Sequence, residues 1–248
     1  MTVYGRSRNP GRVDPGVLGD ILLYEMLADS PLVLWRGYDD GGTDLSGNGR
    51  TGTVGASITT ASNLAGLKAA YGFPGSATDA GNVMAVDASW QSPQASASGK
   101  LTLEAVIHPT SSSEQTVWFK GANNAWEYWL CVELTGKLTL TVWQSVGSAV
   151  MVASSSTGLI STDTTYHVAG TFNRSTPSAV VYINGSSVGS SGSASSTSSD
   201  GSGALRFGVR KDGGTDRSFT GSMSYGAVYK TDLSSARILA HAQAAGLA

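Results

Sequence analysis

Short segments in which apolar and polar residues alternate recur along most of this chain, separated by turns rich in Gly, Ser and Asn. Residues 101–107 (LTLEAVI), 128–134 (YWLCVEL) and 138–142 (LTLTV) each place an apolar side chain at every second position. A period of two puts those side chains on one face of a β-strand. Turn signals at a spacing of roughly 8–12 residues, with no alternation of strands and long helices, indicate an all-β sandwich or barrel.

Two pairs of segments predict β-hairpins. The turn at 135–137 separates the strands expected at 128–134 and 138–142, and strands at 165–172 and 178–183 form the second pair. Asn184-Gly185 follows, a dipeptide that readily adopts the positive φ angles of a type I′ hairpin turn. The Ser/Gly tract at 186–203 has almost nothing to bury, so we expect an exposed loop there.

One helix is expected before the strands and one after them. Asp14 is a good N-cap, Pro15 suits the first helical position, and Pro31 disfavours helical geometry at Ser30. The apolar side chains between them follow one helical face, at Leu18, Ile21, Leu22 and Met26. We predict a short helix over residues 15–30 that caps one end of the sandwich. Further strands are expected at 205–209 and 219–229, and a terminal helix should open at 232–234.

The composition limits the partners of the chain. Its 248 residues suit one large all-β domain, which we place at residues 31–248. A net charge of −2 supplies no basic field for phosphates, so nucleic acid is not an expected partner. The apolar stretch at 21–24 is too short to span a membrane. The single cysteine, Cys131, cannot form an internal disulfide and is expected to be a small buried apolar residue.

Five stretches, in order, resemble the LamG-like, concanavalin A-like lectin/glucanase superfamily. They are LADSPLVLWR (27–36) followed by DLSGNGRTG (44–52), LTLEAVIHP (101–109), YHVAGTF (166–172), VYING (181–185) and the closing segment 219–246. Val106 stands where the family often has Trp. The resemblance implies an antiparallel β-sandwich of the jelly-roll type with a short N-terminal helix and a C-terminal helix. It does not specify a function, because this fold hosts binding modules, hydrolases and viral coat proteins.

Hydrolysis of a glycosidic bond needs two carboxyl groups that flank the bond. Glucanases of this fold carry them on one strand face at two-residue spacing. Here Glu104 has Thr102 and Val106 at that spacing, and Glu133 has Cys131 and Thr135. We therefore expect no enzyme, and a glycoside hydrolase is the least favoured interpretation. The histidines at 108, 167 and 241 lack metal-ligand spacing, which favours structural roles for all three.

Two groups of residues are candidates for binding. Trp129 and Trp143 are opposite in parity to the core residues of their strands, so both could point to one outer face and stack on a sugar; the alternative is that another layer covers them. Trp35, Trp118 and Trp126 are read as core. Calcium is the metal considered, because one turn offers oxygen ligands at Asp44, Ser46 and Asn48, with Asp39 and Asp40 nearby. The alternative there is that Asp44 and Asn48 bond their own backbone to hold the turn.

The opening from LADSP to Trp35 and the ending LSSARILAH are also similar to LamG-like proteins encoded by actinobacterial phages. That resemblance implies a non-enzymatic virion accessory protein, of the capsid decoration or minor tail type, present in many copies on a particle. Residues 1–14 form a polar arm with no hydrophobic period, and its Tyr4, Arg6, Arg8 and Arg12 are expected to dock onto a capsid or tail protein. No apolar run follows the basic residues, so no secretory signal is expected. The alternative is a stand-alone bacterial carbohydrate-binding or adhesion module.

Overall fold

The computed structural model of the chain describes residues 15–37, 41–61, 64, 66–67, 70–76, 78, 81–85, 93–95, 98–122, 125–145, 148–192, 203–211 and 217–248. The predicted docking arm, with Tyr4, Arg6, Arg8 and Arg12, lies outside these residues. Among the described residues, no helix combines the length and the apolar character needed to cross a bilayer.

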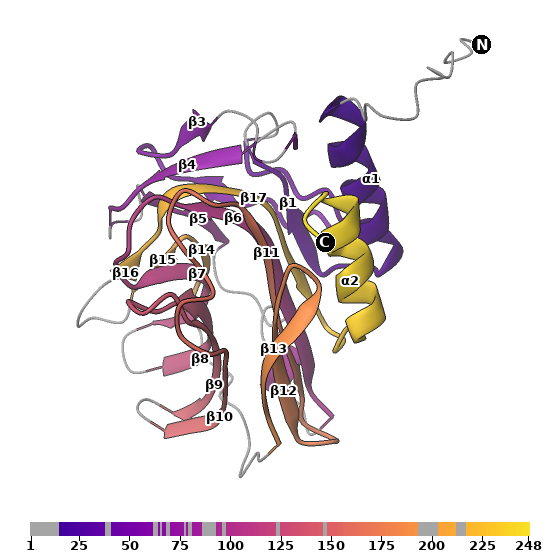
Figure 1. Cartoon of the computed structure of the whole chain (residues 1–248). Helices are drawn as coiled ribbons and strands as arrows, with labels where there is room; N and C mark the ends of the chain where they lie inside the picture. Colours follow the sequence, from indigo (N-terminus) through magenta and orange to yellow (C-terminus); the bar gives the residue numbers. More distant parts are fainter. Residues whose placement is uncertain are drawn as a thin grey trace.

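Two antiparallel sheets face each other and form a sandwich (Figure 1), which confirms the predicted fold class. The larger sheet contains β1 (Val33–Trp35), β3 (Thr59–Ala61), β4 (Ala70–Pro74), β6 (Lys100–Pro109), β11 (Tyr166–Asn173), β12 (Ser178–Ile183), β13 (Ser186–Ser191) and β17 (Thr220–Tyr229). Its strand order is β13-β12-β11-β6-β17-β4-β3, and β1 pairs with β17.

The smaller sheet contains β2 (Thr53–Val54), β5 (Val83–Ala85), β7 (Gln115–Ala122), β8 (Ala125–Val132), β9 (Leu138–Ser145), β10 (Ser148–Ser154) and β14 (Leu205–Phe207). Its order is β10-β9-β8-β7-β14-β5-β2. A separate ribbon pairs β15 (Val209–Arg210) with β16 (Arg217–Ser218). A short 3₁₀ helix, η3, spans Pro93–Ala95.

The main core fills the space between the two sheets. The alternating side chains predicted from the sequence point into it, among them Leu101, Leu103, Ala105 and Ile107 from β6 and Tyr128, Leu130 and Val132 from β8. Trp35 and Trp118 also lie there, with ring centroids 5.5 Å apart. Burial of this surface is the dominant favourable contribution to folding.

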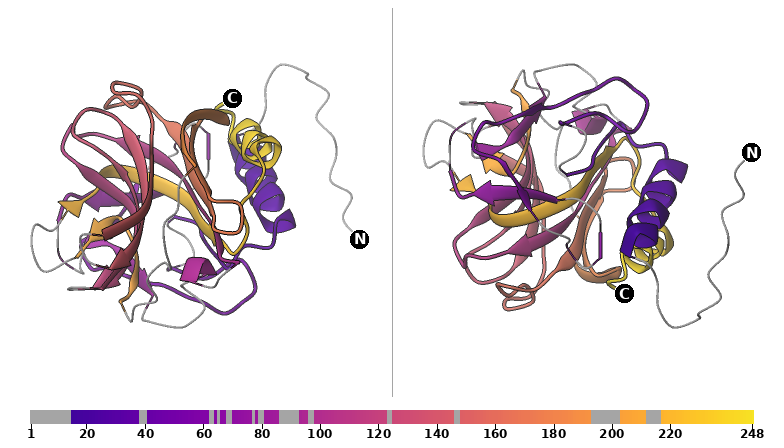
Figure 2. Two further views of the ribbon diagram at one scale, coloured as in Figure 1. Left: turned by 90° about the horizontal axis from the view of Figure 1, so that it is seen from below. Right: turned by 90° about the horizontal axis from the view of Figure 1, so that it is seen from above.

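Helices α1 (Pro15–Ala28) and α2 (Ser235–Ala244) lie side by side on the outer face of the larger sheet (Figure 2). The prediction that the first helix caps one end of the sandwich is therefore wrong. The outward positions of the sheet are themselves apolar, including Val106, Ala227 and Tyr229, and they pack in a second cluster with Leu22 of α1 and Ile238 of α2. An apolar outer face needs a cover, so β6 is buried on both sides.

Two local predictions also need correction. Residues 186–191 were expected to be a loop but form the edge strand β13, because the turn at Asn184-Gly185, with φ of 48° and 78°, directs the chain back along β12. Leu134 was expected to continue the inward pattern of its strand. It lies beyond the end of β8, in the turn, with 69% of its surface exposed.

Candidate ligand-binding site

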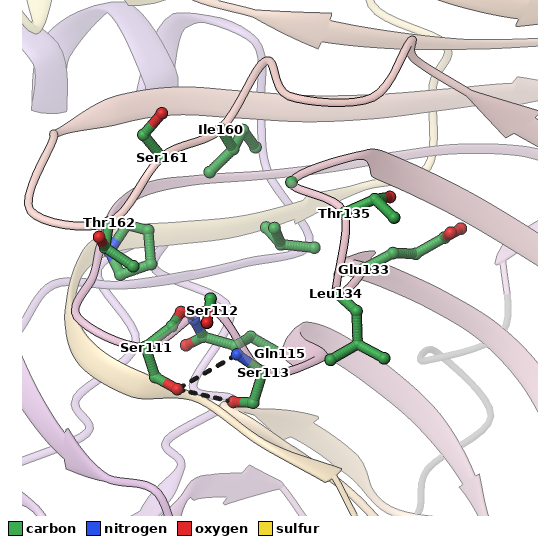
Figure 3. A pocket seen from close by; sticks show the side chains of 13 residues that line it. Ser111, Ser112, Ser113, Gln115, Glu133, Leu134, Thr135, Ile160, Ser161 and Thr162 are labelled. Carbon is green, nitrogen blue, oxygen red and sulfur yellow. Dashed lines mark hydrogen bonds between the residues drawn. The ribbon is translucent and has the colours of Figure 1, made fainter.

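A pocket of about 300 Å³ opens where three connections meet at one end of the sandwich (Figure 3). The first follows β6, the second joins β8 to β9, and the third follows β10. The lining residues are Pro109, Ser111, Ser112, Ser113, Gln115, Val132, Glu133, Leu134, Thr135, Gly136, Ile160, Ser161 and Thr162. These three connections come together because the pairing of the strands places their ends at the same end of the sandwich.

Backbone hydrogen bonds hold the walls of this pocket in place. The amide of Ile160 donates to the carbonyl of Gly136 at 2.9 Å, and the amide of Gly158 donates to the carbonyl of Thr135 at 2.8 Å. Gly136 has φ of 67°, and a Cβ there would collide with the carbonyl oxygen of Ile160. The amide of Asp163 donates to the carbonyl of Pro109 at 2.8 Å. The three loops are therefore tied to one another and not only to their own strands.

The pocket combines a hydroxyl-rich rim with an apolar floor. Ser111 and Ser113 face each other with their hydroxyl oxygens 3.0 Å apart, and Ser112 between them is exposed. Ser161 is exposed across the pocket from them (Figure 3). The buried floor consists of Pro109, Val132 and Ile160. Hydroxyl groups both donate and accept hydrogen bonds, so this rim suits a ligand with many hydroxyls of its own.

Below the rim, Gln115 is 1% exposed and joins two segments of the chain. Its Nε2 donates to the carbonyl of Ser111, and its Oε1 accepts from the amide of Thr220 at 2.8 Å. This side chain therefore supports the serine loop from beneath, and the Ser111 hydroxyl holds the loop from within by accepting from the amide of Ser113 at 3.2 Å.

Glu133 provides the one carboxylate among the described residues that line the pocket. Its Oε1 accepts from the Thr139 hydroxyl at 2.5 Å, and its Oε2 lies 3.1 Å from Nζ of Lys137. Acid and base in glycoside hydrolysis need two carboxyl groups roughly 5–10 Å apart across the bond. The described lining contains one carboxylate and no such pair.

The predicted aromatic residues do come together on the outer face of the smaller sheet. Trp129 and Trp143 stack with centroids 6.3 Å apart, but they are only 7% and 6% exposed. The guanidinium of Arg210 lies 4.3 Å from the Trp129 centroid and 4.6 Å from that of Trp126. Trp126, expected in the main core, belongs to this outer cluster. A sugar could reach these rings only if Arg210 moved, so their role in binding stays a prediction.

Cys131 is buried in the same outer cluster. Burial, followed by the nearby carboxylates of Glu114 and Glu133, raises the pKa of its thiol well above 9.0. A thiol that stays protonated is a poor nucleophile, which agrees with the apolar role expected for this residue.

The predicted calcium residues hold a turn. Oδ1 of Asp44 accepts from the amides of Leu34 at 3.1 Å and Ser46 at 3.0 Å, while its Oδ2 accepts from the amide of Arg50 at 2.9 Å. Nδ2 of Asn48 donates to the carbonyl of Leu32 at 3.1 Å. These hydrogen bonds are the ones expected if Asp44 and Asn48 hold the turn by bonding the backbone. Within the described part of the chain, no group of three or more His, Cys, Asp or Glu side chains could hold a metal ion. Asp39 and Asp40 lie outside the described residues, so calcium binding stays a prediction.

Two histidines converge on Glu104, a carboxylate with no exposed surface beneath the helices. Nδ1 of His241 lies 3.0 Å from Oε2 of Glu104, and Nε2 of His167 lies 3.1 Å from the same oxygen. The hydroxyl of Tyr229 donates to Oε1. His108 stands apart, with Nδ1 3.0 Å from the Thr165 hydroxyl. These contacts form a network that joins α2 to the strands of the larger sheet.

The geometry also assigns the proton positions in this network. Nδ1 of His241 faces Glu104, and its Nε2 lies 3.1 Å from the Glu25 carbonyl and 3.0 Å from Oδ2 of Asp29. Both nitrogens face acceptors, so both must donate, and His241 carries a positive charge. Burial opposes that charge, but the carboxylates of Glu104 and Asp29 outweigh it and raise the pKa of His241 above 6.5.

The sequence did not indicate this pocket, although Glu133 was considered there as a carboxylate for hydrolysis. The lining segments, PTSSSEQ (109–115), ELTGK (133–137) and LISTD (159–163), each follow a strand. Turns between consecutive antiparallel strands fall alternately at the two ends of a sheet. Counting strands could have placed the three hydroxyl-bearing segments at the same end.

Comparison with known proteins agrees with the fold. A family model described as the concanavalin A-like lectin/glucanases superfamily (Laminin_G_3) matches residues 84–239. None of the curated proteins matches the chain.

Solved structures with the same fold include three binding domains of clostridial proteins. The binding domain of Paraclostridial Mosquitocidal Protein 1 has a TM-score of 0.69 at 15% identity, over 86% of this chain and 52% of that one. The botulinum neurotoxin serotype D ligand binding domain, solved in complex with N-acetylneuraminic acid, has a TM-score of 0.67 at 13% identity, over 90% and 52%. The serotype C1 binding domain has a TM-score of 0.66 at 14% identity, over 88% and 53%.

The chain spans about half the length of these binding domains, and at such identities the likeness shows the fold alone. The family model covers more than half of the chain and includes the strands that enclose the pocket. This chain belongs to the concanavalin A-like lectin/glucanases superfamily.

Proposed function

We propose that this chain is a non-enzymatic carbohydrate-binding module that holds a sugar residue in the pocket between the three loops. The observation that carries the proposal is the hydroxyl-rich rim around an apolar floor, set on loops that are tied together by backbone hydrogen bonds. Small-molecule sites are typically concave, largely pre-formed and partly apolar, with a few polar groups that orient the ligand. A volume of about 300 Å³ is at the small end of such sites and suits one sugar residue.

The similar solved structures support this proposal. One is a ligand binding domain solved in complex with N-acetylneuraminic acid, and another, the binding domain of Botulinum Neurotoxin DC, was solved in complex with SialylT. The lone pocket carboxylate supports binding without turnover, because hydrolysis needs a second carboxyl group.

A glycan array, followed by calorimetry on the hits, tests the proposal. Ser112→Trp should block the pocket and abolish binding, since Ser112 is an exposed lining residue. Ser175→Trp is the matched control, because Ser175 is exposed in the turn after β11, whose last residue pairs with the first residue of β6 at the opposite end of the sandwich. Absence of any glycan bound by the unmodified protein, or equal binding by the Ser112→Trp variant, would overturn the proposal.

Catalysis is tested separately with the glycans that bind. Incubation with the unmodified protein should release no new reducing ends. Cleavage that disappears in Glu133→Gln would replace the binding proposal with a hydrolase.

A second proposal concerns where the module works, namely on a phage particle as a capsid decoration or minor tail protein. The two segments that resemble phage proteins pack against each other, since Arg237 of α2 lies 2.9 Å from Asp29 and 2.8 Å from Glu25 at the end of α1. The first of these segments begins at the end of α1, and α1 in turn follows the proposed docking arm at residues 1–14. Display in many copies would convert weak sugar contacts into avidity.

Deletion of residues 1–14 tests the virion proposal. The truncated protein should keep its melting temperature and its glycan affinity but fail to join particles. Full incorporation of the truncated protein into particles would contradict the docking role of the arm. Absence of the intact protein from purified particles would contradict the virion proposal.

A further inference from the structure

We propose that the pocket selects an uncharged sugar residue that carries a methyl group, as in an N-acetylated or a 6-deoxy sugar. This inference rests on the proposed function and adds the chemical class of the ligand. Two independent features of the pocket carry it, the balance of charge around its rim and the apolar composition of its floor.

The charge around the pocket is unfavourable for an acidic sugar. Among Asp, Glu, Lys and Arg, the described residues that line the pocket or adjoin a lining residue in the chain are Glu114, Glu133, Lys137 and Asp163. Three of these are carboxylates. The cation, Lys137, is already 3.1 Å from Glu133, and Glu114 is paired with Arg217. With Arg217 counted, three carboxylates stand against two cations, so an anionic ligand would meet an excess of one negative charge or would have to take Lys137 from Glu133.

The floor favours a small apolar group on the ligand. Val132 and Ile160 are 4% and 6% exposed, and they meet Pro109 beneath the ring of hydroxyls. A hydroxyl that met this floor would be buried without a hydrogen-bond partner, which is costly. A methyl group could instead enter the floor while the ring hydroxyls bond Ser111, Ser113 or Ser161 at the rim.

Glu133 lies in the turn between β8 and β9, opposite the serine loop, and its carboxylate points away from that loop (Figure 3). Its two oxygens contact the Thr139 hydroxyl and Nζ of Lys137. Glu133 therefore contributes to the charge around the pocket, and the serine hydroxyls of the rim remain the groups that would bond the ligand.

Calorimetry with matched sugars tests the inference. N-acetylglucosamine is compared with glucose, and L-fucose with L-galactose, so that each pair differs only by the methyl-bearing group. N-acetylneuraminic acid is compared with its methyl ester, which keeps the N-acetyl group and removes the charge. We expect the methyl-bearing member of a neutral pair to bind at least tenfold tighter. The ester should bind tighter than the acid on the order of threefold, the effect of one unit charge about 6 Å away in a water-like medium.

Glu133→Gln provides the internal check. Removing this carboxylate frees Lys137, so the preference for the ester over the acid should disappear or reverse. Asp232→Asn is the matched control, because Asp232 also pairs with a lysine, Lys100, at a distance of 2.8 Å, at the opposite end of β6 from the pocket. That control should leave the preference unchanged.

The outcomes separate the two proposals. Tight binding of glucose or L-galactose without a gain from the methyl group, or equal binding of acid and ester, would overturn the inference and leave the binding function intact. If the array and all six sugars show no binding, the proposed function fails and the inference fails with it.

Discussion

Replacing His241 with glutamine tests whether a buried charge pair holds α2 to the larger sheet. His241 and Glu104 have no exposed surface, and the ring Nδ1 lies 3.0 Å from the carboxylate. Glutamine keeps a hydrogen-bond donor of similar size but removes the positive charge. Breaking a buried ion pair by removing one partner costs roughly 3–5 kcal/mol, because the other charge stays buried. We expect a loss near the lower value, about 3 kcal/mol, because an amide can still donate to Glu104.

Urea denaturation at pH 6 measures this loss, with the slope of the transition checked for constancy. His108→Gln is the matched control on the same strand as Glu104, since His108 is partly exposed and makes a single described bond, to Thr165. It should cost less than about 1 kcal/mol. A loss below about 1 kcal/mol for His241→Gln would refute the assignment of a charged His241.

The double variant Glu104→Gln with His241→Gln completes the experiment. It leaves no buried charge at this position, so it should be more stable than the sum of the two single losses predicts. A strictly additive double variant would mean that the two side chains do not act as a pair.

Three further predictions follow from the structure. Stability, measured as the denaturation midpoint from pH 3 to pH 9, should be greatest at mildly acidic pH. The raised pKa of His241 makes its contribution to stability complete below pH 6.5, and this contribution is lost as the pH rises through the folded-state pKa. At Glu104, burial opposes the charged form, but His241 and His167 outweigh burial and lower the pKa, so the contribution of Glu104 is lost as the pH falls below 4.5. Asp44→Ala should cost about 2 kcal/mol of stability by leaving backbone amides without an acceptor. The melting temperature of the unmodified protein should be equal in calcium and in chelator, and a higher melting temperature in calcium would favour the metal interpretation. Arg210→Ala should cost about 1–2 kcal/mol by removing a desolvated cation from three tryptophan faces. It should also shift the tryptophan emission to longer wavelength, and an unchanged spectrum would contradict this packing.

The sandwich was predictable because the alternation of apolar residues that defines each strand can be read within a few neighbouring residues. The period of two in β6 places Leu101, Leu103, Ala105 and Ile107 on one face whatever the partner strand is. The positive φ of Asn184 and Gly185 is likewise a property of that dipeptide. Strand β13 was missed because its Ser and Gly residues bury little, and its stability comes from backbone pairing with β12, which composition does not reveal.

The site was not predictable in the same way, because its residues meet only through tertiary register. Glu104 is 63 residues from His167 and 137 from His241, and no spacing rule joins them. Trp129 and Trp143 were placed correctly on an outer face, yet the parity of a strand cannot show that Arg210 lies across their rings. The pocket likewise depends on three loops whose serines and threonines are ordinary turn residues one by one.

The two polar assemblies of this chain should therefore separate in experiment. The Glu104 network lies on the helix-covered side of the larger sheet and shares no residue with the pocket, whose walls are tied together by their own backbone bonds. His241→Gln should lower the melting temperature but leave glycan affinity unchanged when it is measured well below the melting range, because the three loops do not depend on the helices. Ser112→Trp should do the reverse. If loss of His241 also weakened glycan binding at low temperature, the pocket would depend on the helical layer, and the idea of a rigid site carried by the sandwich alone would be wrong.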